Sequence, residues 1–263
     1  MNNTFIMKYI PMNTYIHSLD PRVKLVFAII YLLSIFLSRT FLKFLFLILI
    51  LILITYLAKI QFKYLFSGIK LILFLLIFTS LIHIVFNRQG EILFSFLNFK
   101  IYHGAVISII LIAIRFFLVV SLMTILTITT SPKEVTLAIE KSLNFLNIFS
   151  IHISSFALLI SICIRFIPTL SEETQRIKNA QVSRGAKLNA KGFINKVKNF
   201  IPILVPVFVS ALKRADELAT AMEIRGYDPD KKRTRYKKLK YNKKDFIAYM
   251  FTGLIIVIMY VLK

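Results

Sequence analysis

Two arginine–glycine pairs are the residues of this sequence whose type and spacing most suggest a specific chemistry. Each pair ends a stretch that is typical of an amphipathic helix, and we count the preceding residue with it. The six residues are Ser183, Arg184, Gly185, Ile224, Arg225 and Gly226. An arginine at a helix end presents five N–H donors in a rigid fork, which suits carboxylates and backbone carbonyls of a partner. Because the adjacent glycine keeps the helix end narrow, the pairs predict two helix tips that dock in grooves of another protein.

A single pair of this kind has a simpler explanation. A cation near a helix C-terminus interacts favourably with the helix macrodipole, by about 0.3–1 kcal/mol. Glycine accepts the left-handed backbone conformation that commonly ends a helix. One pair would therefore indicate only an ordinary helix end, whereas two pairs in one basic region favour docking.

Two long helices are predicted to position these tips. The first runs from about residue 156 to 184, with a bend at Pro168 because proline removes a backbone donor. The second runs from about residue 206 to 225 and carries an apolar stripe at helical spacing. Glu172 and Glu173 are predicted to be solvated. The same is expected of Asp216 and Glu217, although either could instead brace Arg214 or the surface of a partner.

Other residues that could carry chemistry are scattered. Arg115 lies inside the apolar run LIAIRFFLVV, where a charge is costly unless it is paired, so a functional contact and a structural pairing both remain open. Cys163, the only cysteine, is expected to be a small core residue. The four histidines show no metal-ligand spacing, and no G-x-x-x-x-G-K-[ST] motif occurs, so we expect no metal and no nucleotide on this chain.

Composition indicates a membrane protein. Of the 263 residues, 57% are hydrophobic, against about 45–50% in soluble domains, and the excess lies in long apolar runs. The fold class predicted is an all-α, polytopic membrane helix bundle in a lipid bilayer. The net charge is +22, and more than half of the Lys and Arg residues lie between Ser171 and Asp245. The positive-inside rule explains this basic region, so we expect no nucleic acid partner.

Five apolar segments are predicted to span the membrane. They are residues 23–38, 42–58, 71–87, 105–129 and 246–262. With the N-terminus inside, the loop over residues 88–103 faces outward. The predicted domains are a four-helix transmembrane bundle (1–130), a cytoplasmic or interfacial coupling domain (131–245) and a C-terminal transmembrane helix (246–263).

Two further uncharged runs leave the topology open. Residues 142–164 and 199–212 contain no charged side chain, and hydropathy alone would place the first across the membrane. Several polar residues in that run favour helices that lie along the inner face of the bilayer instead.

Four segments resemble, in order, the transmembrane T component of energy-coupling factor transporters. They are YIHSLDPRVKL (15–25), LTITTSPKEVTLAIE (126–140), ICIRFIPTLSEETQRIKNAQVSRGA (162–186) and IPILVPVFVSALKRADELATAMEIRGYDP (201–229). In that family two Ala-Arg-Gly motifs dock on a pair of ATPase subunits. The matching positions here keep Arg and Gly, but Ser183 and Ile224 replace the alanines.

The resemblance implies a coupling subunit without catalysis of its own, in the plasma membrane of a prokaryote. It implies as partners two ABC-type ATPases, which bind the ATP, and a membrane S component that binds a vitamin or a transition metal ion. Phe208, Leu212 and Arg115 are candidate contacts for the S component. The substrate itself is not encoded in this chain.

Two other classes of membrane protein fit the sequence less well. A membrane enzyme acting on lipid head groups would need acids or histidines clustered near the membrane surface, and those here are scattered. A secondary transporter would need ionisable residues inside the bundle and an internal repeat, and only Arg115 fits.

Overall fold

The computed structural model describes residues 9–87, 89–96, 99–142, 153–186, 192–228 and 241–262. The chain divides into two compact units, one of residues 1–139 with 239–263 and the other of residues 140–238. We describe each unit by itself.

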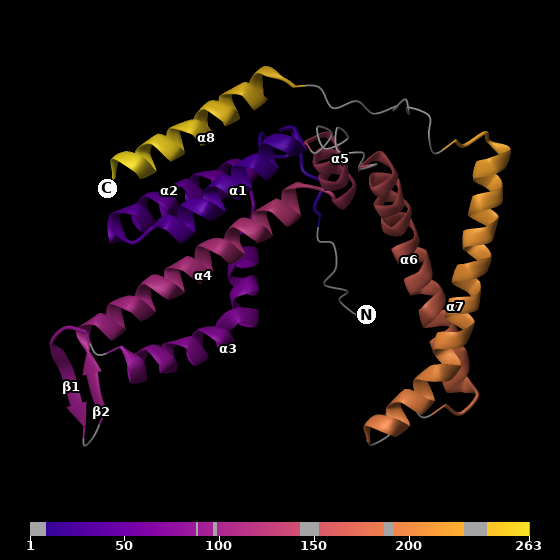
Figure 1. The fold of residues 1–263 in the computed structure, drawn as a ribbon, viewed down its shortest axis with the longest axis horizontal. Coiled ribbons are helices and arrows are strands. Elements are labelled where there is room, and N and C mark those ends of the chain that lie inside the picture. The colour runs from indigo at the N-terminus through magenta and orange to yellow at the C-terminus, as the bar shows by residue number, and fades with distance from the viewer. Residues whose placement is uncertain are drawn as a thin grey trace. The chain divides into compact units, whose positions relative to one another are not determined.

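The first unit is a bundle of long apolar helices. They are α1 (Pro21–Leu37), α2 (Phe41–Ala58), α3 (Phe62–Phe86), α4 (His103–Thr129) and α8 (Lys243–Val261). A short helix, α5 (Pro132–Ser142), follows α4 along the chain, and its first part belongs to this unit. Figure 1 shows α4 between the α1–α2 pair and α3, and α4 packs against all three, while α8 packs on α1. Each of the five predicted spanning segments is a helix.

The core of this unit lies where α1, α2, α4 and α8 meet. Its fully buried side chains include Tyr31 and Ile35 on α1, Phe44 on α2, Leu118 on α4 and Ile255 on α8. Outside the core, large apolar side chains point away from the bundle, and the exposed fraction reaches 81% for Phe74 and 87% for Tyr260. Such a surface is stable against lipid rather than water.

Helices long and apolar enough to cross a bilayer are found in both units. Within the described residues they are α2, α4, α8 and residues 155–183, while residues 73–86 of α3 form a shorter apolar stretch and α1 has 17 residues. The protein is a polytopic helical membrane protein. Residues 143–152, part of the run whose position the sequence leaves open, lie outside the described residues.

A small β-hairpin occupies much of the predicted outward loop. Strands β1 (Ile92–Phe96) and β2 (Phe99–Tyr102) pair antiparallel, with Phe96 opposite Phe99. Aromatic and β-branched residues in these strands favour the extended conformation. Neither this hairpin nor the short helix α5 is predicted from the sequence.

The starts of α1 and α8 are joined by buried carboxylates. Asp20 caps α1 by accepting a hydrogen bond from the Arg22 amide (2.9 Å). Asp245, only 2% exposed, accepts from the amides of Asn242 (2.7 Å) and Asp20 (2.8 Å). Arg22 also donates to the hydroxyl of Tyr241 at 3.1 Å. The two helices therefore begin at a common point.

The second unit contains two long helices, α6 (Ile153–Ser183) and α7 (Phe193–Ile224). The helix from 156 to 184 is confirmed, and it continues through Pro168. The predicted start of the second helix at residue 206 is wrong, because α7 begins at Phe193 and includes all of residues 199–212. Proline at 202 and 206 removes two backbone donors without ending the helix, and the apolar spacing continues across both. Figure 1 shows that α7 changes direction in its first half.

Candidate coupling site

The first helix tip, residues 183–185, is the C-terminal end of α6. The amide of Gly185 donates to the carbonyl of Val182 at 2.9 Å, and the amide of Ala186 donates to that of Gln181 at 3.0 Å. Gly185 has a φ of 89°, which an L-residue with a side chain rarely adopts. These are the two hydrogen bonds and the left-handed glycine of a Schellman motif. The Arg184 side chain is exposed.

The second tip, residues 224–226, repeats this geometry at the end of α7. Gly226 donates to Glu223 at 2.9 Å, Tyr227 donates to Met222 at 2.9 Å, and Gly226 has a φ of 69°. Arg225 is exposed, and Ile224 before it has an exposed fraction of 81%. The two tips therefore share one backbone shape and differ mainly in the side chain before the arginine.

The glycines are required by the backbone of the tips. A Cβ added at Gly185 or Gly226 would meet no other atom within 4 Å, so neither glycine is explained by crowding in this chain. The positive φ explains both. The backbone conformation of both pairs is therefore that of an ordinary helix end. The arginine of each pair is exposed at this end.

A polar contact joins α6 to α7. The guanidinium of Arg214 lies 3.0 Å from the carboxylate of Glu173, and the hydroxyl of Ser210 donates to the same carboxylate. Glu173 lies 11 residues before Arg184, and Arg214 lies 11 residues before Arg225. In Figure 1 α6 and α7 run in opposite directions. At 1.5 Å per residue each tip is about 16 Å from the contact, so the tips lie roughly 30 Å apart at opposite ends of the pair.

Comparison with known proteins covers almost the whole chain. Residues 12–236 match the family described as cobalt transport protein. The energy-coupling factor transporter transmembrane protein EcfT of Staphylococcus aureus is 38% identical over 262 residues, which are 100% of this chain and 98% of that protein. EcfT of Bacillus subtilis is 40% identical over 245 residues, covering 93% of this chain and 92% of that protein.

The chain belongs to the EcfT family. It is the transmembrane component of an energy-coupling factor transporter, and the family name implies association with the other components of that transporter. The resemblance drawn from the four sequence segments is confirmed.

One face of α7 in this EcfT protein is apolar and exposed. Phe208 and Leu212, predicted contacts for an S component, have exposed fractions of 61% and 51%. They continue a stripe at helical spacing that also contains Ile201, Leu204 and Val205. The structure therefore brings these two residues together on one surface.

Arg115 is directed into the bundle. Its Nη2 donates to the backbone carbonyl of Ser38 at 3.1 Å, and its guanidinium lies 5.8 Å from the centre of the Phe44 ring. Ser38 is buried and is the C-cap of α1, so the cation lies at the negative end of that helix. These contacts give Arg115 a structural pairing.

Cys163 is exposed on α6, so the prediction of a core cysteine is wrong. Its neighbours on the helix are also unpacked, since Phe156, Ile160 and Ile167 are between 45% and 63% exposed. Within the described ranges, no group of three or more His, Cys, Asp or Glu side chains is placed to hold a metal ion.

The contact between the two long helices is not predicted from the sequence. Glu173 is predicted to be solvated and Asp216 or Glu217 to be a possible partner of Arg214, whereas Glu173 is the residue in contact. Glu172 and Glu173 are adjacent and of the same type, so the sequence carries no signal that selects Glu173 for this contact.

Proposed function

We propose that this chain couples two cytoplasmic ATPase subunits to a substrate-binding S component in the plasma membrane of a prokaryote. The observation that carries the proposal is the pair of exposed arginines on two helix ends of the same backbone shape, Arg184 and Arg225. Each tip enters a groove of one ATPase. Nucleotide binding and hydrolysis move the ATPases, and α6 and α7 transmit the motion.

The chain itself is proposed to be a non-catalytic subunit. ATP is bound by the partner subunits, and the work of this chain is mechanical. Guanidinium groups are suited to this task because charge-assisted hydrogen bonds to carboxylates or carbonyls keep a fixed geometry under load.

The apolar face of α7 supports the second half of the proposal. A membrane S component is itself hydrophobic, so Phe208 and Leu212 can pack against it without leaving buried polar groups unpaired. The S component determines the substrate, a vitamin or a transition metal ion. The description of the matched family as cobalt transport is consistent with the metal alternative.

Charge reversal tests the docking of the tips. We expect Arg184→Glu with Arg225→Glu to abolish co-purification of the ATPases in mild detergent while the chain remains in the membrane. Each single change weakens binding less, because the other tip still holds its ATPase. The matched control is Lys178→Glu with Lys213→Glu, which reverses two exposed cations on the same helices away from the tips. Normal ATPase binding by the tip variant, or equal loss in the control, overturns the proposal.

A further inference from the structure

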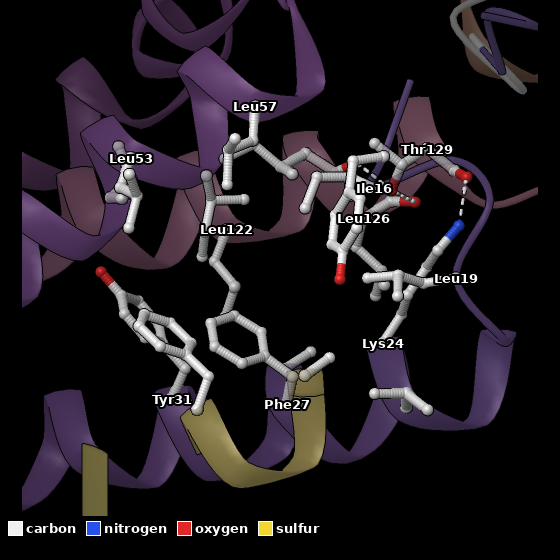
Figure 2. Close-up of a pocket in the computed structure, with 18 of the residues that line it drawn as sticks. Ile16, Leu19, Lys24, Phe27, Tyr31, Leu53, Leu57, Leu122, Leu126 and Thr129 are labelled. Atoms are coloured by element: carbon white, nitrogen blue, oxygen red, sulfur yellow. Dashed lines mark hydrogen bonds between the residues drawn. The ribbon is translucent and has the colours of Figure 1, made fainter. Parts of the chain in front are cut away.

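The bundle of the first unit contains an apolar cavity beside α1. Its volume is about 230 Å³, and it is lined from α1, α2, α4 and α8. Figure 2 shows Lys24 at one end of this cavity and Tyr31 toward the other. These residues are seven positions apart on α1, so the cavity extends about 10 Å along the helix, or about a third of the ~30 Å hydrocarbon core.

The rim of the cavity consists of exposed apolar side chains. Leu53 and Leu57 on α2 are 45% and 40% exposed, and Ile247 on α8 is 60% exposed. In a bilayer these residues face acyl chains. An apolar cavity of about 150 Å³ already accepts a benzene-sized ligand, so this one has room for part of a single acyl chain.

A polar hollow adjoins the cavity. Its volume is about 480 Å³, and it shares Tyr15 with the cavity. Its wall carries hydrogen-bonding side chains, which are Asn13, Thr14, His17, Ser18 and Lys244. The ammonium of Lys244 lies 5.5 Å from the centre of the Tyr15 ring, where the two spaces meet. An apolar space that opens beside a polar one matches the two parts of a phospholipid.

One lysine lines each of the two spaces. Lys24 lines the cavity and Lys244 lines the hollow, and among the described residues that line them there is no Asp or Glu. Lys24 Nζ donates to the carbonyls of Thr129 (2.9 Å) and His17 (3.2 Å), which uses two of its three donors. The carboxylates of Asp20, Asp245 and Glu134 act electrostatically on Lys24 and offset its charge. The cation that faces an anionic head group is therefore Lys244.

We propose that the cavity and the hollow together hold one anionic phospholipid, with part of an acyl chain beside α1 and the phosphate beside Lys244. Basic pockets between membrane helices bind anionic head groups in this way. The lipid then fills the space between α1, α2, α4 and α8. The site is independent of the docking of ATPases on the helix tips.

The absence of tryptophan from the chain permits a direct test. Leu53→Trp places a fluorescent side chain on the rim. Leu49→Trp is the matched control, because Leu49 is 57% exposed one turn away on α2 and does not line the cavity. Both variants are reconstituted in phosphatidylcholine vesicles that contain increasing fractions of phosphatidylglycerol with brominated acyl chains, which quench tryptophan on contact.

We expect half-maximal quenching of Trp at 53 at about fivefold lower mole fraction than at 49, the preference that one cationic side chain gives near a membrane surface. Adding Lys244→Glu should remove this difference, whereas Lys63→Glu, at an exposed lysine away from the hollow, should leave it. Equal quenching at both positions overturns the proposal. If brominated phosphatidylcholine also quenches Trp at 53 at a lower mole fraction than Trp at 49, the proposal of an anionic head group is overturned.

A second measurement uses the chain without tryptophan. Native mass spectrometry after exposure to phosphatidylglycerol should show one retained lipid per chain, lost in Lys244→Glu and kept in Lys63→Glu. Retention of the lipid by the Lys244→Glu chain would contradict the assignment of the phosphate to the hollow.

Discussion

Glu173 on α6 and Arg214 on α7 form an ion pair at 3.0 Å, and each lies 11 residues before the arginine at the tip of its own helix. The pair is partly open to solvent, with side-chain exposures of 24% and 39%. A contact of this kind contributes about 0.2–1 kcal/mol to stability. Its importance is therefore geometric, because it fixes where two long helices touch.

Reversing one charge of this pair should change the distance between the tips. We expect Arg214→Glu to repel Glu173 and to broaden the distance distribution between spin labels on cysteines placed at Ser183 and Ile224, in a chain with Cys163→Ser. The double variant Glu173→Arg with Arg214→Glu should restore a narrow distribution, since it re-forms the pair with opposite polarity. An unchanged distribution in the single variant would show that the contact does not set the tip spacing.

The tip glycines should tolerate alanine poorly. At the positive φ of Gly185 and Gly226 an alanine costs about 1–2 kcal/mol. We expect the last helical turn to unwind and ATPase affinity to fall in each variant. Gly253→Ala is the control, because Gly253 is inside α8 with open space around it and no positive φ, so alanine there should be neutral or slightly stabilising. Equal effects at all three positions would contradict the argument from the backbone.

Arg115 should matter for stability of the bundle. Loss of its hydrogen bond to the Ser38 carbonyl in Arg115→Leu should cost about 1.5–3 kcal/mol, the range for bonds to charged groups. Unfolding in mixed micelles measures this cost, and Arg39→Leu, at an exposed arginine near the same corner, is the control. Normal stability of Arg115→Leu combined with loss of an S component would instead assign Arg115 to that interface.

Asp245 should hold the start of α8 against α1. Asp245→Ala removes the acceptor for the amides of both Asn242 and Asp20, whereas Asn242→Ala removes only a helix cap. We expect the first variant to be more sensitive to proteolysis before α8 than the second. Equal sensitivity would mean that the link to Asp20 contributes nothing beyond capping.

Cys163 offers a test of where the first half of α6 lies. It is the only cysteine and is exposed, so maleimide reagents reach it without further changes to the chain. If this part of α6 lies along the inner face of the membrane, as we expect, a charged maleimide labels it in inside-out vesicles and not in intact cells. Labelling of intact cells would place the residue on the outer side.

The elements that the sequence predicts well are those determined by local physics. Hydropathy identifies the spanning helices because a run of about twenty apolar residues is stable in the hydrocarbon core of a bilayer and unstable when exposed to water. The Arg-Gly pairs mark two helix ends because glycine alone adopts the required φ easily. The start of α7 is missed because the helix is predicted to begin near Pro206, whereas it runs through both Pro202 and Pro206.

Contacts between distant residues are what the sequence conceals. Nothing near Arg115 in the chain indicates that its partner is the carbonyl of Ser38. Every residue has a backbone carbonyl, so the residue type at position 38 does not identify it as the acceptor. Glu173 resembles its solvated neighbour Glu172 in every local respect, and only the packing of α6 on α7 distinguishes them.

The antiparallel arrangement of α6 and α7 about the Glu173–Arg214 contact has a mechanical consequence. Forces of equal size and opposite direction, applied at the two tips, sum to zero on the helix pair. They cannot displace it as a whole. The components of these forces that are perpendicular to the helices form a couple about the contact, so sideways motion of two partners against the tips would be converted into rotation.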